Sequence, residues 1–108
     1  MKRQNLEKKL LSNARAIIAH EVAIPMGCIH MSKILSWLGP DIADQYPVFD
    51  SYMDEVQALP LAQERLKWNC KTLLEKDQEL QLINQKYRKD ILIACFDIID
   101  KNHQKNSA

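Results

Sequence analysis

All six glycine and proline residues of this 108-residue chain fall between positions 25 and 60. The 24 residues before that window and the 48 after it contain neither type. Glycine frees φ and proline removes a backbone donor, so these residues interrupt regular structure more strongly than any others. The chain is therefore predicted to form a first helix, a middle part of shorter helices and a long helical C-terminal half.

Apolar side chains recur at helical spacing before and within that window. They predict a first amphipathic helix over residues 4–23, which Pro25 ends or kinks because the residue before a proline leaves the α region. A second helix is predicted over residues 26–38, before the Gly39-Pro40 stop. A third short helix is predicted over about 48–59.

The C-terminal half carries a helical apolar stripe almost to its end. It predicts a short helix at 62–67 and a long one at about 70–102, with Asn69 as its N-cap. Such a helix spans ~50 Å, whereas a compact domain of this length has a radius of gyration of ~13 Å. The helix must therefore overhang, bend or gain a neighbour, and its apolar end at 91–99 is expected to pack antiparallel to the first helix. Residues 103–108 are expected to fray.

These segments predict an all-α fold, with one domain over residues 1–108 that is ordered from about 4 to 102. The expected architecture is a small bundle of four to five helices whose long C-terminal helix packs against the N-terminal helix. A hydrophobic content of 46% and a charged content of 27% are ordinary for a globular domain and argue against disorder.

Charge is spread unevenly, although the net charge is only +1. A nearly neutral chain gives no reason to expect nucleic acid as a partner. Residues 40–64 contain six carboxylates and no Lys or Arg. A candidate acidic docking surface for a basic partner comprises Asp41, Asp44, Asp50, Asp54 and Glu55. The alternative is that these carboxylates form an ordinary solvated face.

The cysteines Cys28, Cys70 and Cys95 are odd in number and lack CxxC spacing. That pattern argues against a disulfide framework and favours a reducing compartment, so the expected location is the cytoplasm. The chain has no signal-peptide core and no run of 18 apolar residues, so it is not expected to cross a membrane itself.

Chemically capable residues are few. His20-Glu21 resembles half of a metalloprotease motif, but Ile24 stands where the second histidine is needed. Cys28 and His30 are two positions apart on a predicted helix and point about 200° apart, so they cannot easily share a metal. Two glycines cannot build a phosphate-binding loop. The sequence therefore predicts no catalytic residue, no cofactor and no metal site.

The overhanging part of the long helix is the predicted interface, through Leu73, Leu80, Ile83 and Tyr87. Trp37 and Trp68 are candidates for stacking on a ligand, although tryptophans on amphipathic helices more often serve the core or a partner contact.

Several short stretches occur in a recognisable order. They are Asn13-Ala14-Arg15-Ala16-Ile17-Ile18, Met26-Gly27-Cys28-Ile29-His30-Met31-Ser32-Lys33-Ile34-Leu35, Tyr46-Pro47-Val48-Phe49, Leu59-Pro60, and a charged helix through Leu74-Glu75 and Tyr87. In this order the chain resembles, over roughly residues 10–100, the bacterial family catalogued as domain of unknown function 2489. The family is uncharacterised, so the resemblance implies no activity, substrate or cofactor.

Members of that family often carry an N-terminal membrane helix followed by a charged helical stalk. The chain starts at Met1-Lys2-Arg3, inside what would be the stalk. The resemblance thus implies either a soluble protein or the cytoplasmic part of a protein anchored at the inner membrane by a segment that this chain does not contain.

Two hypotheses on function follow. The first is a non-catalytic protein–protein interaction or self-association module, with a protein partner or a homodimer. The second is a small ligand-binding or enzymatic bundle with a site in the breaker-rich middle, near His20, His30 and Tyr46, which predicts a concave pocket with convergent polar groups there. Within the second hypothesis, enzymatic activity is expected less than ligand binding.

Overall fold

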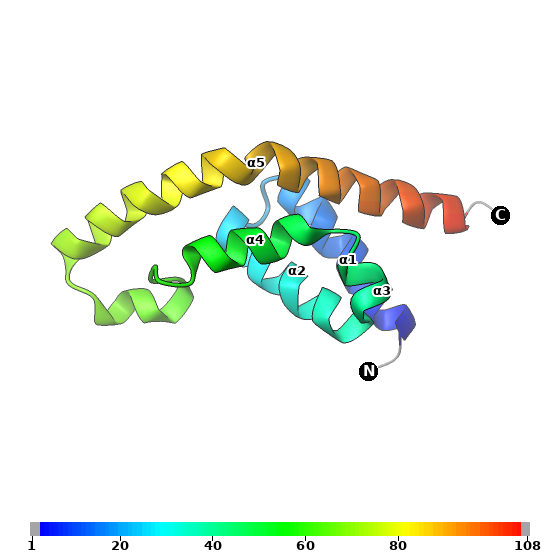
Figure 1. Ribbon diagram of the computed structural model, residues 1–108, viewed down its shortest axis with the longest axis horizontal. Helices are drawn as coiled ribbons and strands as arrows, with labels where there is room; N and C mark the ends of the chain where they lie inside the picture. The colour runs from blue at the N-terminus through cyan, green and yellow to red at the C-terminus, as the bar shows by residue number, and fades with distance from the viewer. Residues whose placement is uncertain (1–2, 107–108) are drawn as a thin grey trace.

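A computed structural model describes the backbone of residues 3–106, and the side chains of this range except at 62 and 102–106. In chain order the elements are α1 (Arg3–Ile18), α2 (Ile24–Leu38), α3 (Pro40–Ala43), α4 (Pro47–Val56), the 3-10 helix η1 (Ala62–Lys67) and α5 (Cys70–Asn106). No strand occurs in the described part of the chain. Figure 1 shows α5 spanning the long axis, with the other helices beneath it. The prediction of an all-α bundle with a long C-terminal helix is confirmed.

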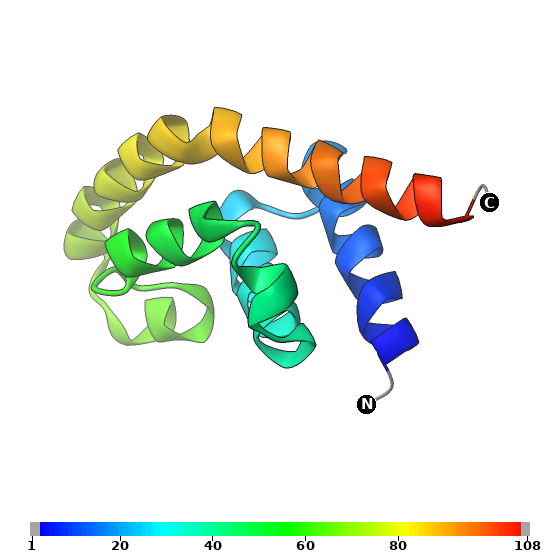
Figure 2. The same cartoon turned by 45° about the vertical axis from the view of Figure 1, so that its right-hand side comes forward.

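Helix α5 sets the shape of the molecule. Its 37 residues correspond to about 55 Å at 1.5 Å per residue, and the molecule measures 54 × 28 × 23 Å. Figure 2 shows α5 arching over the other helices, as long helices do when they wrap around a core. The helix overhangs the bundle at its start and bends, so two of the three expected ways of accommodating its length occur together.

The start of α5 follows the prediction and its end does not. The Asn69 side-chain oxygen accepts a hydrogen bond from the Thr72 backbone N–H at 2.8 Å, which is the expected N-cap. The helix then continues to Asn106 rather than stopping near 102. Residues 107–108 lie outside the described part of the chain, and the frayed tail stays a prediction.

The core lies where α1, α2 and α4 meet the C-terminal half of α5. Among its buried side chains are Leu6, Leu10, Ala14 and Ile17 from α1, and Ile91, Ala94, Cys95 and Ile98 from α5. Leu10 shares a small hollow with Ile98, and Ile17 shares another with Ile91. Helices α1 and α5 therefore pack antiparallel, as predicted.

Helix α1 ends at Ile18, so the prediction that it reaches residue 23 is wrong. His20 has a positive φ of 60°, and its N–H donates to the Ile17 carbonyl at 3.3 Å. The Glu21 N–H donates to the Ala16 carbonyl at 3.0 Å. These two bonds form the Schellman motif, in which a left-handed residue closes a helix. Glycine usually fills that position and histidine only sometimes, so the sequence contains no evident stop signal.

The chain then reverses, and α1 and α2 form an antiparallel hairpin. Pro25 lies in the first turn of α2, where its missing donor costs nothing, so it neither ends nor kinks the first helix. A Cβ atom at Gly27 would lie 2.5 Å from Cγ1 of Ile17, so glycine permits the close approach of the two helices. The Asn13 side-chain N–H donates to the Gly27 carbonyl at 2.9 Å and fixes the same crossing.

The middle part contains one helix that the sequence analysis misses. Gly39 has a φ of 105° and closes α2, and Pro40 then begins the single turn of α3. Helix α4 occupies most of the predicted segment but stops at Val56. Segment 62–67 is helical as predicted, in the tighter 3-10 form. The Arg65 guanidinium ties it to α5 through two bonds to the Asp77 carboxylate, at 2.6 and 2.9 Å.

Candidate functional site

A groove of about 460 Å³ opens along the α1–α2 hairpin. Every described residue that lines it belongs to these two helices or to the turn between them. The lining consists of Lys9, Ser12, Asn13 and Ala16 from α1, Val22 from the turn, and His30, Lys33, Ile34 and Trp37 from α2. Its volume falls within the roughly 300–1,000 Å³ that is typical of small-molecule sites, but the groove is open rather than enclosed.

The spacing of the lining residues explains the shape of the groove. On each helix they recur at i, i+3, i+4 and i+7, which places them on one stripe. Each stripe covers about two turns, or ~10 Å. Ala16 has a short side chain between the two walls, while Val22 and Ile34 add apolar surface. The groove is therefore a short apolar trough between two helical walls.

Basic groups and an exposed aromatic ring border this trough. Lys9 and Lys33 stand on opposite walls, and His30 lies on the α2 wall. None of the described residues that line the groove is acidic. Trp37 has 59% of its surface exposed, which is unusual for a side chain whose burial in proteins is normally extensive. An apolar floor with a cationic border suits an apolar ligand that carries negative charge.

The structure does not bring together the residues of the predicted site in the middle of the chain. His30 lines the α1–α2 groove, and His20 lies in a separate hollow beside Arg88 of α5. Tyr46 lies in a third hollow, beside Lys101. A common site at His20, His30 and Tyr46 is therefore not formed, and only His30 contributes to the groove.

Tyr46 is a structural tie rather than a chemical group available to a ligand. Its buried hydroxyl donates to the Asp97 carboxylate at 2.8 Å. Burial, and then this carboxylate, hold the pKa of Tyr46 well above its usual value, so the hydroxyl stays protonated. Lys101 Nζ lies 3.2 Å from the same carboxylate and 5.4 Å from the centre of the Tyr46 ring. Together these contacts fasten the start of α4 to α5.

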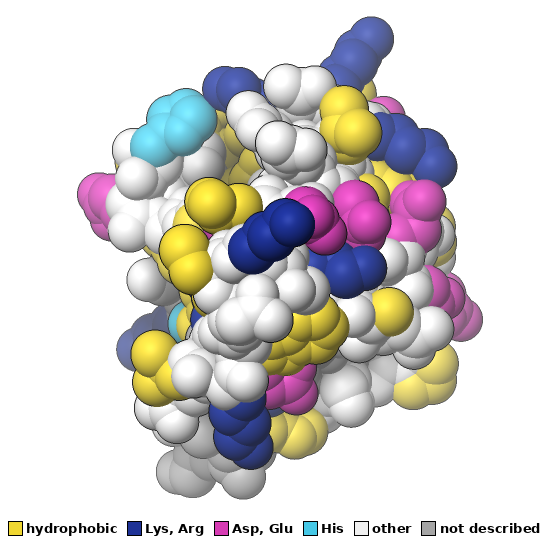
Figure 3. All heavy atoms as spheres, turned by 90° about the vertical axis from the view of Figure 1, so that its left-hand side faces the viewer, with side chains coloured by type: hydrophobic (Ala, Val, Ile, Leu, Met, Phe, Trp, Pro, Cys, Tyr) yellow, Lys and Arg dark blue, Asp and Glu magenta, His cyan; other side chains and the backbone are white. Residues whose placement is uncertain are grey.

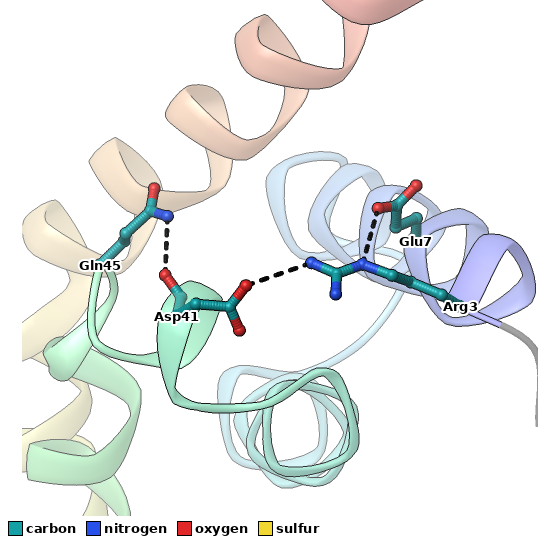
Figure 4. Close-up of polar contacts among 4 residues, drawn as sticks. All are labelled: Arg3, Glu7, Asp41 and Gln45. Atoms are coloured by element: carbon teal, nitrogen blue, oxygen red, sulfur yellow. Dashed lines mark hydrogen bonds and ion pairs between the residues drawn. The ribbon is translucent and has the colours of Figure 1, made fainter.

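Intrachain ion pairs engage part of the predicted acidic docking surface. Figure 4 shows Arg3 between two carboxylates: its guanidinium lies 3.4 Å from Asp41 and 3.5 Å from Glu7. The Gln45 side chain also donates to the Asp41 backbone carbonyl, at 3.0 Å. These contacts join the start of α1 to α3.

The other acidic residues lie on or before α4. Glu55 pairs with Lys86 of α5 at 3.1 Å. Asp44, Asp50 and Asp54 are exposed. A docking role for this surface stays a prediction.

Three of the four predicted interface residues of α5 pack against the protein's own core. Leu80, Ile83 and Tyr87 are partly buried and pack against the core, and the Tyr87 ring meets Tyr52 edge to face at 5.9 Å. Leu73 is half-buried. Leu80, Ile83 and Tyr87 therefore face inward, and a partner contact through the stripe stays a prediction.

Other apolar side chains of α5 face outward. The exposed ones are Leu74, Leu82, Ile93 and Phe96. Figure 3 shows the end of the molecule where α5 begins, and there hydrophobic side chains are interspersed with acidic and basic ones.

Two of the three cysteines are part of the core. Cys28 and Cys95 are fully buried and Cys70 is exposed, and all three are free thiols. Burial raises the pKa of both Cys28 and Cys95 to about 12, and proximity to Cys95 adds to the effect on Cys28. Thiols held in this way are inert packing groups.

Two further observations concern the part of the chain that the structure describes. No group of three or more His, Cys, Asp or Glu side chains is placed to hold a metal ion. No helix combines the length and the apolar character needed to cross a membrane.

Comparisons with known proteins identify no relative. No family model matches the chain, and neither a curated protein nor a solved structure matches it. The resemblance to the domain of unknown function 2489 family stays a prediction.

Proposed function

We propose that this protein is a non-catalytic helical interaction module that binds a partner protein in the α1–α2 groove. The observation that carries the proposal is the apolar floor of the groove beside the exposed ring of Trp37. Burying apolar surface stabilises an interface by about 25 cal/mol per Å². Tryptophan is enriched among the residues that dominate interface energies.

The form of the groove favours a protein segment over a small molecule. It is an open trough along two helices rather than an enclosed cavity, whereas small-molecule sites typically bury roughly 70–90% of the ligand surface. A helix laid against a helical hairpin buries its own apolar stripe in just such a trough. The partner is therefore expected to contribute a third helix beside α1 and α2.

The proposal places the module in the cytoplasm. Cys70 is an exposed free thiol and Cys28 and Cys95 are buried free thiols, a usage that suits a reducing compartment. Attachment to the inner membrane through a segment outside this chain is supported only by the family resemblance.

Photo-crosslinking in the native host tests the proposal. A photoreactive amino acid replaces Trp37, and in a matched control it replaces Ser51, which is exposed on α4. We expect one protein adduct of defined mass from position 37 and none of that mass from position 51. The adduct should disappear when Ala16→Phe fills the floor of the groove in a protein whose thermal unfolding shows that it remains folded. Adducts common to both positions, or unaffected by Ala16→Phe, contradict the proposal.

A further inference from the structure

We infer that the occupant of the α1–α2 groove is an acidic amphipathic helix of about two turns. This inference rests on the proposed function and adds the chemistry of the partner. Three features of the groove support the inference: the backbone of its walls, the register of the hairpin and the sign of the charges beside the trough.

The backbone of the walls selects a helix. Both walls are α-helices, Arg3–Ile18 and Ile24–Leu38, whose N–H and C=O groups bond within their own helix. An extended segment laid in the groove would find no backbone donors or acceptors, and its own buried groups would lose hydrogen bonds to water. A helix satisfies its backbone internally and presents only side chains. Two turns of it match the ~10 Å length of the lining stripes.

The register of the hairpin places the charges. Ile17 meets Gly27 near the turn, and Arg3 pairs with Asp41 at the open end. This alignment puts Lys9 level with the turn of α2 that carries Lys33 and Trp37. Positive charge thus borders both sides of the open half of the groove.

The closed half of the groove is more apolar. Ala16 and Val22 line it, and the same alignment places His30 there. A fitting helix therefore sets an apolar anchor near Ala16 and carboxylates near the two lysines, with a second anchor against the Trp37 ring.

Charge complementarity selects the acidic helix over a basic or neutral one. The groove lining contains two lysines and, among the described residues, no carboxylate. A surface ion pair changes affinity only severalfold, but a basic helix loses both attractions and meets two repulsions instead. We therefore expect a preference of roughly tenfold for an acidic over a basic helix of the same apolar sequence.

A pair of synthetic peptides tests the inference with the full chain. Each is about 14 residues long, enough for two seated turns with flanks, and carries apolar anchors at i, i+4 and i+7. One peptide has Glu and the other Lys at the flanking positions. Fluorescence anisotropy of the labelled peptides gives both Kd values, and circular dichroism confirms the fold of every variant.

The expected result is binding of the acidic peptide that is roughly tenfold tighter than that of the basic one. Lys9→Glu with Lys33→Glu should reverse the preference. The matched control, Lys71→Glu with Lys89→Glu, changes two exposed lysines of α5 outside the groove and should leave the preference unchanged. Failure of the acidic peptide to bind, or an equal effect of the control pair, overturns the inference.

Three further outcomes show whether this inference, the proposed function or both fail. Equal affinity for both peptides, lost in Ala16→Phe, overturns the acidic helix but leaves the groove as a protein-binding site. Peptide binding that survives Ala16→Phe counts against the groove and so against both. Binding of phosphatidylglycerol vesicles that depends on Lys9 and Lys33, without binding of the acidic peptide, overturns the inference in favour of an anionic membrane surface.

Discussion

The Cα atom of Gly27 lies against Ile17 so closely that a Cβ at position 27 would be 2.5 Å from Cγ1 and 2.8 Å from Cδ1 of that isoleucine. This contact sets the spacing of α1 and α2, and with it the width of the groove. Glycine is a poor residue inside a helix, where alanine is favoured by about 1 kcal/mol. At this position the steric cost opposes that gain.

We predict that Gly27→Ala lowers the free energy of unfolding by roughly 1–3 kcal/mol, because Ile17 or the whole of α1 must move. Urea unfolding followed by circular dichroism measures the change. The double variant with Ile17→Ala should be less destabilised than the sum of the two single changes, since the clash is then removed. A Gly27→Ala protein more stable than the wild type would mean that the hairpin tolerates a wider spacing.

Among the non-glycine residues that the structure describes, His20 alone has a positive φ, of 60°. A side chain in this conformation costs about 1–2 kcal/mol relative to glycine, partly offset by the flexibility of glycine in the unfolded chain. We predict that His20→Gly raises the unfolding free energy by about 0.5–1 kcal/mol and that the β-branched His20→Val lowers it. His30→Gly is the matched control, because it lies inside α2 and should lose about 1 kcal/mol. Destabilisation by His20→Gly would contradict the assigned helix end.

Acid should weaken the tie between α4 and α5. The hydrogen bond from Tyr46, followed by Lys101, lowers the pKa of Asp97 below its usual value. A carboxylate whose pKa is lower in the folded state contributes stability above its unfolded pKa of about 3.9 and loses it as the pH falls through the folded pKa. We predict that the urea midpoint falls less steeply below about pH 4 in Asp97→Asn than in the wild type. Tyr46→Phe should shift the slope in the same direction, and an unchanged slope in both variants counts against the pairing.

Most of the fold can be predicted from the sequence because the strongest signals are local. The Asn69 cap and the apolar stripe are properties of neighbouring residues, and they locate the start of α5 and its packing against α1. The end of α1 is different, since a left-handed histidine closes it without a glycine. Helix α3 is a single turn and leaves no periodic pattern to find.

The candidate site is much less predictable than the fold. Helical periodicity identifies the stripe that contains Leu80 and Ile83 but not the side on which a neighbour lies, and the structure shows the protein's own core there. The groove depends on how two helices cross, which Gly27 and Ile17 decide. The sequence contains one signal for the groove. Its lining residues share the i, i+3, i+4, i+7 spacing in segments 9–16 and 30–37, and Trp37 is a large aromatic side chain on the second of these stripes.

The thiols should differ sharply in reactivity. Cys28 and Cys95 are fully buried with pKa values raised to about 12, and Cys70 is exposed at the start of α5. Only a thiolate reacts readily with a disulfide reagent. We predict that Ellman's reagent at pH 8 titrates one thiol in the native protein and all three in urea. Cys70→Ser should remove the native reaction, whereas fast reaction of a second thiol would mean that the core opens.

The solution mass should be that of a monomer, 12.6 kDa. Leu80, Ile83 and Tyr87 are engaged by the core. The outward side chains of α5 are Leu74, Leu82 and the neighbouring pair Ile93 and Phe96, and the gaps from Leu74 to Leu82 and from Leu82 to Ile93 are about 12 and 16 Å at 1.5 Å per residue. A stable dimer buries about 800 Å² on each partner, more than such separated side chains supply. Light scattering on a sizing column over a tenfold concentration range measures the mass. A dimer that Leu82→Glu dissociates would contradict this prediction and would make the outer face of α5 a self-association surface, whereas one that resists Leu82→Glu would place the contact elsewhere.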